Sequence, residues 1–589
     1  MWPFVISNVR RPNSRRRRPD VSPLEDRCLL SVTLSETPTG LPYVGTPVVL
    51  SAASGGHGHT PVYQFRVGQP GGPLQVVSDF SRSDSFTWDP MQEGTYVIQV
   101  VVKASYTAAR SETATSTYTA HSRVTGDTAV VSPMANPLVA LYSAPPSSGT
   151  SMDVQFAALS SNPAWQDTSP EAIVPGESTN FIVAGMLPDT TYLMRDVVDN
   201  GTVSAPLEFT TGSLPGNMKF PSFTVVQPPG SGIDSSQGVI FHAGLDTTTV
   251  NTVATNLAGQ IVWYYDPVAN HFSGYATNIE PGGSVMILGG SPVGNTASWD
   301  TLRQVDLAGN TLRQTNIHAV NAQLAARHLP PILSFSHEAK LLPNGDTAVM
   351  AETRKVAEFR GKSTVFVGNM VLVLDPNFQV SWAWNSFHWL STNQIGKVQG
   401  TPKNWLHGNA VSWSPEDNNL IVSLRTPSLV LKIDYANGTG NGHILWKLGE
   451  HGNFQAIANS PDPWFSGQHD VRYINNNTLL VFDDGNNRRQ TEPTANSRGQ
   501  EWLLNEQNMT ATLQVNAHLG NYSPYLGSVE LLSNGNLAFT SGGLGTPTDQ
   551  AGQSIEVLPT GSRIYALQMN QYEYRSYFES TLYSASLLD

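Results

Sequence analysis

The pattern of hydrophobic and polar positions predicts short β-strands along almost the whole chain. Apolar and polar residues alternate over short runs, and clusters of Gly, Pro, Asn, Asp or Ser end each run, as at 48–51, 62–65, 85–88 and 94–100. A helical period of 3.6 residues is rare; 321–329 is one short helix candidate. We therefore expect an all-β fold.

Two regions near the start predict small β-sandwiches. Residues 32–124 hold short strands separated by Gly/Pro/Ser turns, and residues 125–213 form a second such unit. The second unit resembles fibronectin type III modules in 187–192 and 209–212, and 213–215 read as a linker. We expect immunoglobulin- or fibronectin III-like sandwiches, which usually serve as spacers or adhesion modules.

From residue 216 onward a strand–turn–strand unit repeats. It occurs at 280–287, 342–345, 415–422, 475–481 and 533–538. Hairpins with an Asp/Gly turn and an aromatic return strand lie between these units, at 257–263, 306–310, 374–382 and 433–446. Repeats of about four strands indicate propeller blades, although about sixty residues exceeds the usual 40–45. Residues 216–589 would then form a six-bladed β-propeller.

Composition narrows the class of function. Charged residues make up 13% of the chain, against roughly 25% in an average globular protein. The formal net charge is −13, although residues 1–27 carry 7 of the 33 Lys and Arg and only 3 of the 46 Asp and Glu. The remainder is therefore acidic, which argues against a nucleic-acid-binding body. Cys28 is the single cysteine, so an intramolecular disulfide or a cysteine zinc site is excluded. No apolar stretch is long enough to span a membrane.

The first 31 residues form a basic segment. Six arginines lie between Arg10 and Arg18, and the sequence Leu24-Glu25-Asp26-Arg27-Cys28-Leu29-Leu30-Ser31 follows. This stretch resembles a tag found at the start of many large surface or exported bacterial proteins. A disordered basic tail is the alternative. The resemblance favours an extracytoplasmic location: periplasmic, cell-surface or secreted.

Three histidines precede the turn in three consecutive repeats: His337, His407 and His469. They would meet if the repeats surround an axis. Asn409 lies two residues beyond His407 and so would share its strand face, and Arg425 ends the following strand. Such histidines can instead cap turns or bind the next blade. A three-histidine metal site fits the count, but no carboxylate repeats nearby and the guanidinium would oppose a cation.

An ordered set of motifs resembles the bacterial arylsulfate sulfotransferases, over about 125–589. The motifs are Ser336-His337 with Leu342-Pro343-Asn344-Gly345, Trp405-Leu406-His407-Gly408-Asn409, Ser423-Leu424-Arg425, 444–449, Gln468-His469 with 480–486, and 573–583. Members of this family have a six-bladed propeller after a β-sandwich and work in the periplasm. They move a sulfuryl group without PAPS, the nucleotide sulfate donor. The family also includes homodimers.

The resemblance implies a role for each matching residue. His469 corresponds to the nucleophile that becomes transiently sulfated, and His337, His407, Asn409 and Arg425 correspond to sulfuryl-binding positions. The implied reaction is ping-pong transfer from an aryl sulfate to a phenol, with no cofactor and no metal. Neutral imidazole suits the nucleophile because its unperturbed pKa is about 6.5.

Further ligands are predicted from spacing. Arg354 and Asn486 each lie seventeen residues after their histidine, much as Arg425 lies eighteen after His407. Trp405, Trp464 and Phe465 are candidates for an aryl pocket, with core packing as the alternative for each.

The chain departs from the family pattern in places. It lacks the cysteine pair of many relatives, Gly408 replaces a bulkier apolar residue, and the sandwich at 32–124 lies outside the match. The alternative function is therefore a non-catalytic surface protein that uses the same fold for adhesion or for binding glycans or anions.

Overall fold

The computed structural model describes residues 31–40, 42–55, 60–199, 201–246, 248–269, 271–290, 292–293, 296–297, 299–393, 395–475 and 477–586. The structure is 51% strand and 4% helix, which confirms the prediction of a mostly β protein. Cys28 and the predicted targeting segment up to residue 30 lie outside the described residues.

Two sheets with a shared core make up the first region. The strands are β1 (Ser31–Thr37), β2 (Val48–Gly55), β3 (Val62–Gly68), β4 (Gln75–Ser81), β5 (Ser85–Trp88), β6 (Gly94–Lys103) and β7 (Ser111–Ala120). Strands β1, β2 and β5 form one sheet, while β4, β3, β6 and β7 belong to the other. Alternate side chains of both sheets, including Leu50, Phe65 and Val100, form one buried cluster, as the strand period requires.

The second region has the same two-sheet plan. Its strands are β8 (Val130–Pro133), β9 (Ala140–Ala144), β10 (Ser151–Ala158), β11 (Gln166–Asp167), β12 (Glu171–Ala172), β13 (Thr179–Val183), β14 (Thr191–Val198), β15 (Thr202–Val203) and β16 (Leu207–Thr210). Tyr142, Phe156 and Met194 lie in its core. The first two regions therefore each have a core of their own; the predicted boundaries at 124/125 and 213/216 fall between strands and stay predictions.

Six consecutive sheets follow within the described residues. Their first strands are β44 (Glu573–Glu579), β21 (Ser273–Glu280), β27 (Ile332–Leu341), β31 (Gly408–Trp413), β36 (His469–Ile474) and β40 (Gly527–Leu531). The second strands are β18 (Val239–Gly244), β22 (Ser284–Gly290), β28 (Thr347–Phe359), β32 (Leu420–Leu424), β37 (Thr478–Asp483) and β41 (Leu537–Thr546). The third strands are β19 (Thr252–Thr255), β25 (Thr301–Val305), β29 (Lys362–Leu374), β33 (Leu429–Ile433), β38 (Arg498–Asn505) and β42 (Asp549–Val557). The fourth strands are β20 (Ile261–Tyr264), β26 (Thr311–Asn316), β30 (Val380–Asn385), β34 (Ile444–Leu448), β39 (Thr510–His518) and β43 (Arg563–Met569).

Shorter elements complete the sheets. Strands β17 (Phe223–Gln227) and β35 (Gln455–Ile457) add a fifth strand to two of them, and β23 (Pro292–Val293) pairs with β24 (Thr296–Ala297). The helices are α1 (Ile317–Ala326), α2 (Ser386–Trp389), α3 (Asn486–Thr491) and the 3₁₀ turn η2 (Ala436–Gly438).

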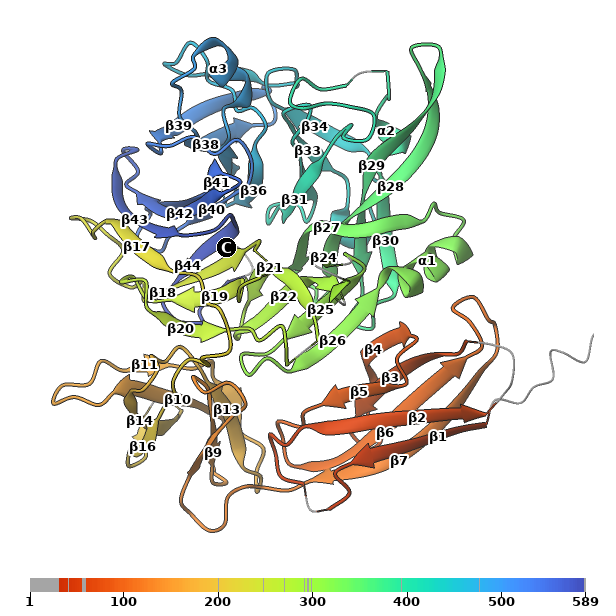
Figure 1. Cartoon of the computed structure of the whole chain (residues 1–589), viewed down its shortest axis with the longest axis vertical. Coiled ribbons are helices and arrows are strands. Elements are labelled where there is room, and N and C mark those ends of the chain that lie inside the picture. The colour runs from red at the N-terminus through yellow and green to blue at the C-terminus, as the bar shows by residue number, and fades with distance from the viewer. Residues whose placement is uncertain are drawn as a thin grey trace, which may run out of the picture.

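The six sheets form a closed ring around one axis (Figure 1). The first strands are neighbours: Tyr473 on β36 donates its N–H to Ser412 Oγ on β31 at 3.2 Å, and Tyr577 on β44 donates its hydroxyl to the Thr277 carbonyl on β21 at 2.8 Å. Strand β44 pairs antiparallel with β18, more than 300 residues earlier. The last strand of the ring therefore completes its first sheet.

A repeated turn explains the hairpins predicted between the third and fourth strands. The Asp306 carboxylate accepts the N–H groups of Ala308 and Asn310 at 2.9 Å each. Asp375 accepts those of Asn377 and Gln379 at 2.8 Å each. A short acidic side chain thus holds its own turn closed, as Asx turns do. The Asp/Gly signal in the sequence reflects this bond.

Helix α1 differs from its prediction. The sequence period placed a helix at 321–329, whereas the helix is Ile317–Ala326. Asn316 caps it by accepting the N–H groups of His318 and Ala319, which fixes the start several residues earlier. The helix ends before Pro330 and Pro331, since proline disfavours a helical conformation in the preceding residue.

The first region continues a sheet of the ring. Strand β4 pairs parallel with β26, so that eight strands form one sheet. Two hydrogen bonds support the joint: Thr315 Oγ1 donates to Asp79 Oδ2 at 2.8 Å in a buried contact, and Val76 N–H donates to Asn377 Oδ1 at 3.0 Å in a partly buried one. Nothing in the hydrophobic pattern had indicated that the two regions share a sheet.

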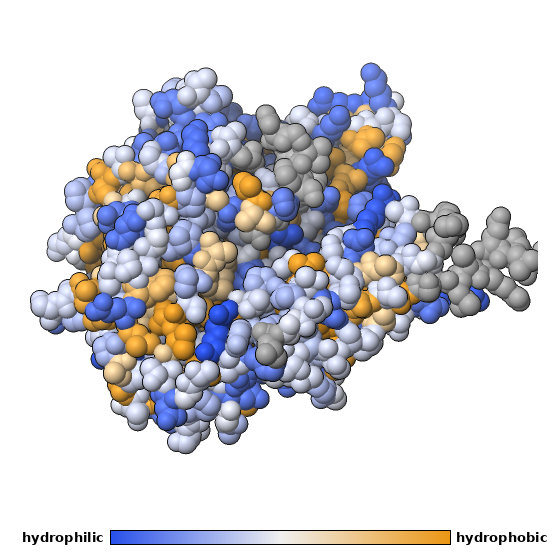
Figure 2. Space-filling view, turned by 60° about the horizontal axis from the view of Figure 1, so that its bottom comes forward, coloured by the Kyte–Doolittle hydropathy of each residue, from blue (hydrophilic) through white to orange (hydrophobic). Residues whose placement is uncertain are grey.

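On the face that Figure 2 shows, hydrophobic residues form separate patches among polar ones. Exposed apolar side chains are spread over both halves of the chain, from Val49 to Leu503. No helix within the described ranges is long and apolar enough to cross a membrane.

Candidate active site

Irregularities in three first strands position the predicted histidines. The pairing of β27 with β28 is interrupted between Phe335 and Ala339, around His337; that of β36 with β37 shifts at Asp470, directly after His469. His337 and Asp470 have positive φ angles of 59° and 47°. A β-bulge re-aims the side chains beside it and is common next to active sites.

The bulge in β31 changes one part of the sequence argument. The register shifts between Gly408 and Ala410, which leaves Asn409 as the extra residue. His407, with φ of 51°, lies just before β31 begins. The three histidines therefore do not occupy one common register point. Because the bulge breaks the strand alternation, the two-residue spacing no longer places His407 and Asn409 on one face, and their shared orientation stays a prediction.

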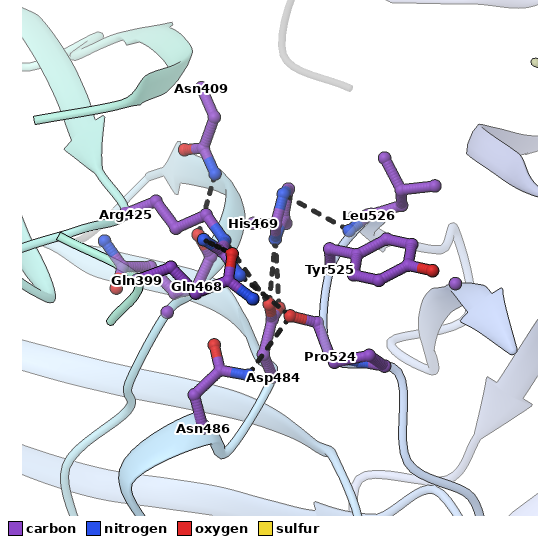
Figure 3. Close-up of polar contacts among 12 residues, drawn as sticks. Gln399, Asn409, Arg425, Gln468, His469, Asp484, Asn486, Pro524, Tyr525 and Leu526 are labelled. Carbon is purple, nitrogen blue, oxygen red and sulfur yellow. Dashed lines mark hydrogen bonds and ion pairs between the residues drawn. The ribbon is translucent and has the colours of Figure 1, made fainter. Parts of the chain in front are cut away.

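His469 is held at both ring nitrogens. Nδ1 lies 3.0 and 3.1 Å from the two carboxylate oxygens of Asp484, and Nε2 lies 3.2 Å from the backbone N–H of Leu526 (Figure 3). A backbone N–H can only donate, so Nε2 is the acceptor and Nδ1 carries the proton. The imidazole is therefore the Nδ1–H tautomer, with its lone pair on Nε2.

Burial controls the charge of this pair. His469 is 3% exposed and Asp484 is fully buried. Burial, and after it the positive charge of Arg425, lowers the pKa of His469 well below its usual value, so the ring is neutral at pH 7. Burial also raises the pKa of Asp484, and Arg425 opposes this shift. The bound Nδ1–H and the guanidinium at 3.8 Å favour the ionised carboxylate.

Arg425 supplies a fixed positive charge beside His469. Its guanidinium is 2% exposed. Nη2 donates to the Pro524 carbonyl at 2.9 Å and Nη1 to Gln399 Oε1 at 3.3 Å, while Nε has no hydrogen-bond partner among the described residues. Because Arg425 follows β32 and its N–H donates to the His407 carbonyl, the strand end sets its position. The guanidinium has unused capacity to bind an anion.

Asn409 and Gln468 add polar atoms that lack partners. Asn409 is 1% exposed; its Nδ2 donates to the Gln468 carbonyl at 2.8 Å, and its Oδ1 has no partner within the described ranges. Gln468 Oε1 is also buried and unpaired there. Unsatisfied buried polar atoms are rare in native proteins, so their grouping here marks a place for a polar ligand or water.

His337 and His407 lie together, with ring centroids 4.8 Å apart. His407 Nδ1 is 2.7 Å from Asn404 Oδ1, and the Asn404 amide is oriented by donation to the Gln399 carbonyl. His337 Nδ1 is 3.1 Å from the Tyr574 hydroxyl, which itself donates to the His337 carbonyl. In both rings Nδ1 is therefore the donor and Nε2 is left with its lone pair.

Both rings of this pair are neutral at pH 7. Burial lowers the pKa of His407 to about 4, and the charge of Arg425 adds to the shift. The pKa of His337 is lowered well below its usual value, by burial first and then by His407. Both side chains stay partly exposed, whereas His469 is covered. They are the imidazoles that an entering substrate can reach.

A layer of paired charges lies behind the histidines. Arg575 Nη1 donates to Glu338 Oε2 and Nη2 to the Asn409 carbonyl at 3.1 Å. Arg472 Nε lies 3.6 Å from Asp470 Oδ2. These groups come from β44, β27 and β36, and all are buried. Because Glu338 and Asp470 directly follow His337 and His469, the ion pairs fix the two bulges in place.

The two further ligands predicted from spacing, Asn486 and Arg354, differ in whether they lie near the histidines. Asn486 lies close to the cluster, since its Nδ2 donates at 3.1 Å to the same Pro524 carbonyl that Arg425 binds. Arg354 is exposed on the long hairpin of β28 and β29. In the described part of the chain it makes no hydrogen bond or ion pair with the histidines or Arg425, so the structure does not bring Arg354 to the cluster.

Two of the aryl-pocket candidates are buried in cores, and Trp464 packs against a core while staying partly exposed. Trp405 is 2% exposed and stacks on Phe387 at 5.0 Å, and Trp464 stacks on Trp502 at 5.0 Å; Phe465 is 1% exposed. Tyr525 lies beside His469 instead (Figure 3). On the His337 side, Tyr275 packs against Tyr574 at 4.6 Å. The aromatic side chains near the site thus differ from those that the sequence indicated.

Three groups that contact the histidines were not predicted from the sequence. Asp484 belongs to a quoted motif but carried no assigned role, and Asn404 lies three residues before His407 without any motif of its own. Spacing between motifs gives no sign of either contact. The Leu526 N–H is a backbone group, so no residue type could reveal it. No group of three His, Cys, Asp or Glu side chains in the described part of the chain is arranged to hold a metal ion.

The sequence was also compared with known proteins. The model of the arylsulfotransferase (ASST) family matches residues 232–578, more than half of the chain. The chain belongs to the arylsulfotransferase family. It is therefore a sulfotransferase enzyme, and the family resemblance noted from the motifs is confirmed. All the candidate residues, from His337 to Asn486, lie inside the matched region.

Other comparisons add little to this family assignment. No curated protein matches the chain. A two-domain fibronectin type III segment of chicken tenascin is 16% identical over 31% of this chain and 98% of its own, with a TM-score of 0.13. A putative oxidoreductase (glucose dehydrogenase) of Thermus thermophilus is 14% identical over 65% of this chain and 94% of its own, with a TM-score of 0.21. A rhamnogalacturonan lyase of Bacillus licheniformis is 11% identical over 74% of each chain, with a TM-score of 0.25. These TM-scores are too low to establish a shared fold.

Proposed function

We propose that this arylsulfotransferase moves a sulfuryl group from an aryl sulfate to a phenol through a sulfated His469. The observation that carries the proposal is the buried neutral imidazole of His469, with its proton on Nδ1 facing Asp484 and a guanidinium at its side. The six sheets are taken as the blades of a β-propeller, and the regions at 32–124 and 125–213 as immunoglobulin- or fibronectin III-like modules. The extracytoplasmic location rests on the basic tag and the family resemblance alone.

In the first half-reaction Nε2 of His469 attacks the sulfur. The sulfur–oxygen bond to the aryl group breaks, and its electron pair leaves with the phenolate. The Nδ1 proton stays on the ring, where the Asp484 carboxylate stabilises the positive charge that develops as Nε2 bonds to sulfur. Arg425 binds the sulfuryl oxygens, as a charge-assisted donor does for other oxyanions.

In the second half-reaction a phenol accepts the group. Its proton passes to Nε2 of His337 or His407, its oxygen attacks sulfur, and the sulfur–nitrogen bond breaks so that the electron pair returns to His469. Because each Nε2 of the pair holds a lone pair, these histidines suit proton acceptance. This changes the role expected from the resemblance: a neutral Nε2 cannot donate to a sulfuryl oxygen, so the pair would bind the group only when protonated.

The alternative is a protein that binds anions without turnover. The buried guanidinium of Arg425 would serve that purpose equally well. The Nδ1–H tautomer of His469 favours the enzyme, because a binding site for an anion would gain from a donor at Nε2 and not from a lone pair there.

A donor–acceptor assay separates the two functions. With p-nitrophenyl sulfate and no acceptor, we expect one equivalent of nitrophenol per enzyme, a burst that signals a covalent intermediate. Adding a phenol should give steady turnover with ping-pong kinetics, and mass spectrometry of the acceptor-free sample should find the sulfate on the peptide that contains His469. Absence of nitrophenol release across several aryl sulfates and phenols would contradict the enzyme and leave the anion-binding function.

A further inference from the structure

The backbone of the turn Ser523–Gly527 makes hydrogen bonds to both reactive groups of the site, the imidazole of His469 and the guanidinium of Arg425. Leu526 donates its N–H to Nε2 of His469 at 3.2 Å, and the Pro524 carbonyl accepts Arg425 Nη2 at 2.9 Å (Figure 3). The same carbonyl also accepts Asn486 Nδ2 at 3.1 Å. One short segment before β40 therefore engages both the nucleophile and the fixed cation.

These two contacts compete with the proposed chemistry. The lone pair that accepts the Leu526 N–H is the one that must attack sulfur, and a nitrogen lone pair accepts one partner at a time. A covalent nitrogen–sulfur bond is much shorter than the 3.2 Å contact, so sulfur would enter the space in front of the N–H. Likewise, a sulfuryl oxygen on Arg425 Nη2 would replace the Pro524 carbonyl.

Hydrogen bonds fix the turn at Ser523, its first residue. Near its other end, Leu526 has an unfavourable backbone conformation. Ser523 Oγ accepts the Gly543 N–H at 2.8 Å and donates to the Tyr525 carbonyl at 2.7 Å, and the Ser523 N–H donates to Ser497 Oγ at 2.9 Å. Leu526 has a φ of 66°, a left-handed conformation that bulky L residues rarely adopt. Such a conformation persists only where its surroundings enforce it, and it is common at ligand clamps and switch regions.

We propose that Ser523–Gly527 is a strap that caps His469 in the empty enzyme and becomes part of the sulfuryl site when substrate binds. The sulfuryl group displaces the Pro524 carbonyl from Arg425 and the Leu526 N–H from Nε2. The freed N–H then donates to a sulfuryl oxygen, as backbone donors do at other oxyanion sites. The proposal rests on His469 being the nucleophile, and it adds a backbone donor to the side chains already described.

Chemical labelling of His469 tests the cap without any sulfuryl transfer. Diethyl pyrocarbonate acylates neutral imidazole nitrogens, so its rate at His469, measured by peptide mass spectrometry, reports how often Nε2 is uncovered. Ser523→Ala removes the anchor; we expect labelling about tenfold faster than in the wild type, equivalent to about 1.4 kcal/mol. Ser414→Ala is the matched control, a fully buried turn serine at the opposite end of β31 from His407, and should label at the wild-type rate.

The transfer rate tests the second role of the strap. Loss of one oxyanion donor costs about 10²- to 10³-fold, so a loosened donor in Ser523→Ala should slow the nitrophenol burst by about tenfold. The Ser414→Ala control lies outside the site and should keep the burst rate within about threefold of the wild-type value, equivalent to about 0.7 kcal/mol.

Each outcome decides a separate point. Equal labelling in Ser523→Ala, Ser414→Ala and the wild type would overturn the cap, whatever the activity. A burst slowed as strongly in Ser414→Ala as in Ser523→Ala would overturn the donor role of the strap, because the loss would then follow from general destabilisation. If labelling responds as expected but no variant and no wild-type sample releases nitrophenol, the cap stands and the sulfotransferase mechanism fails.

Discussion

Among the described residues of the ring, two buried histidine–carboxylate pairs look alike and have different surroundings. His242 Nδ1 lies 2.6 Å from Glu573 Oε1, with both side chains fully buried. His469 Nδ1 lies 3.0 Å from Asp484 Oδ1, with exposures of 3% and 0%. The pairs differ at the other ring nitrogen: His242 Nε2 lies 3.0 Å from Thr255 Oγ1, whereas His469 Nε2 meets a backbone N–H.

The comparison shows which part of such a pair makes it reactive. At His242 a fixed side chain occupies Nε2, and the ring of Phe223 lies 4.7 Å away, so the pair links β18 to β44. At His469 the occupant of Nε2 belongs to a turn, and Arg425 lies beside the carboxylate. A buried histidine–carboxylate pair therefore does not indicate catalysis by itself; access to the second nitrogen and a nearby cation do.

The largest expected effect comes from removing each histidine. His469→Ala should lower the transfer rate by about 10⁴-fold or more, as loss of a catalytic nucleophile does, while the chain stays folded because Asp484 keeps Arg425 as a partner. His242→Ala should do the opposite: the enzyme keeps its chemistry but loses about 3–5 kcal/mol of unfolding free energy, since Glu573 stays buried without its partner. Burst kinetics and urea unfolding measure the two. Comparable activity loss in both variants would contradict the assignment of a catalytic role to His469 and a structural role to His242.

The second effect concerns the carboxylates. Asp484→Asn still offers an oxygen to the Nδ1–H but removes the charge that stabilises the sulfated ring. We expect a loss of about 10- to 100-fold in kcat, the range found for carboxylates that orient metal-ligating histidines. Glu573→Gln should change kcat by less than about threefold, equivalent to about 0.7 kcal/mol, because the hydrogen bonds of that pair go to Thr255 and Ser554 and not to His469, Asp484 or Arg425. A wild-type rate for Asp484→Asn would restrict Asp484 to a structural role.

The smallest effect is on pH dependence. The working form of His469 and of the His337–His407 pair is neutral, so activity is present above their pKa values and lost as pH falls through them. Burial and Arg425 lower the pKa of His407 to about 4 and that of His469 well below the usual value. The acid limb of kcat/KM should therefore lie well below the value of about 6.5 for free imidazole.

Arg425→Met gives the matched measurement for this profile. Without the positive charge the histidine pKa values rise, so the acid limb of the residual activity should move to higher pH. A limb that stays in place would mean that burial alone sets these pKa values. A limb near about pH 6.5 in the wild type would contradict the buried, neutral state of the site.

The sequence predicted much of this architecture because local bonds determine it. The repeated Asx turns and alternating strands are visible in residue types, and so are the histidines and Arg425. The bulges at Asn409 and Asp470 were missed, since they depend on contacts with neighbouring sheets: Arg575 on β44 donates to the Asn409 carbonyl, and Asp470 accepts the Val529 N–H of β40. Arg354 shows the limit of spacing as an argument: seventeen residues along a chain lead to a different place when the hairpin is longer.

Contacts made by the backbone could not be predicted from residue types, because every residue carries the same backbone groups. The Leu526 N–H and the Pro524 carbonyl act at the centre of the site, yet the residue types reveal neither. The joint between β4 and β26 is likewise a main-chain pairing between regions far apart in sequence. Predictions from motifs therefore recovered side chains better than they recovered the surfaces that position them.

The closure of the ring by β44 also has a consequence for the order in which the protein becomes active. Arg575 and Tyr574, which support Asn409 and His337, come from this strand, and Glu573 lies 331 residues after His242. During synthesis the first sheet lacks its strand β44 until the other five sheets have emerged from the ribosome. The nascent chain therefore holds every predicted site residue long before it holds a complete site, and sulfuryl transfer would begin only after this late strand has inserted.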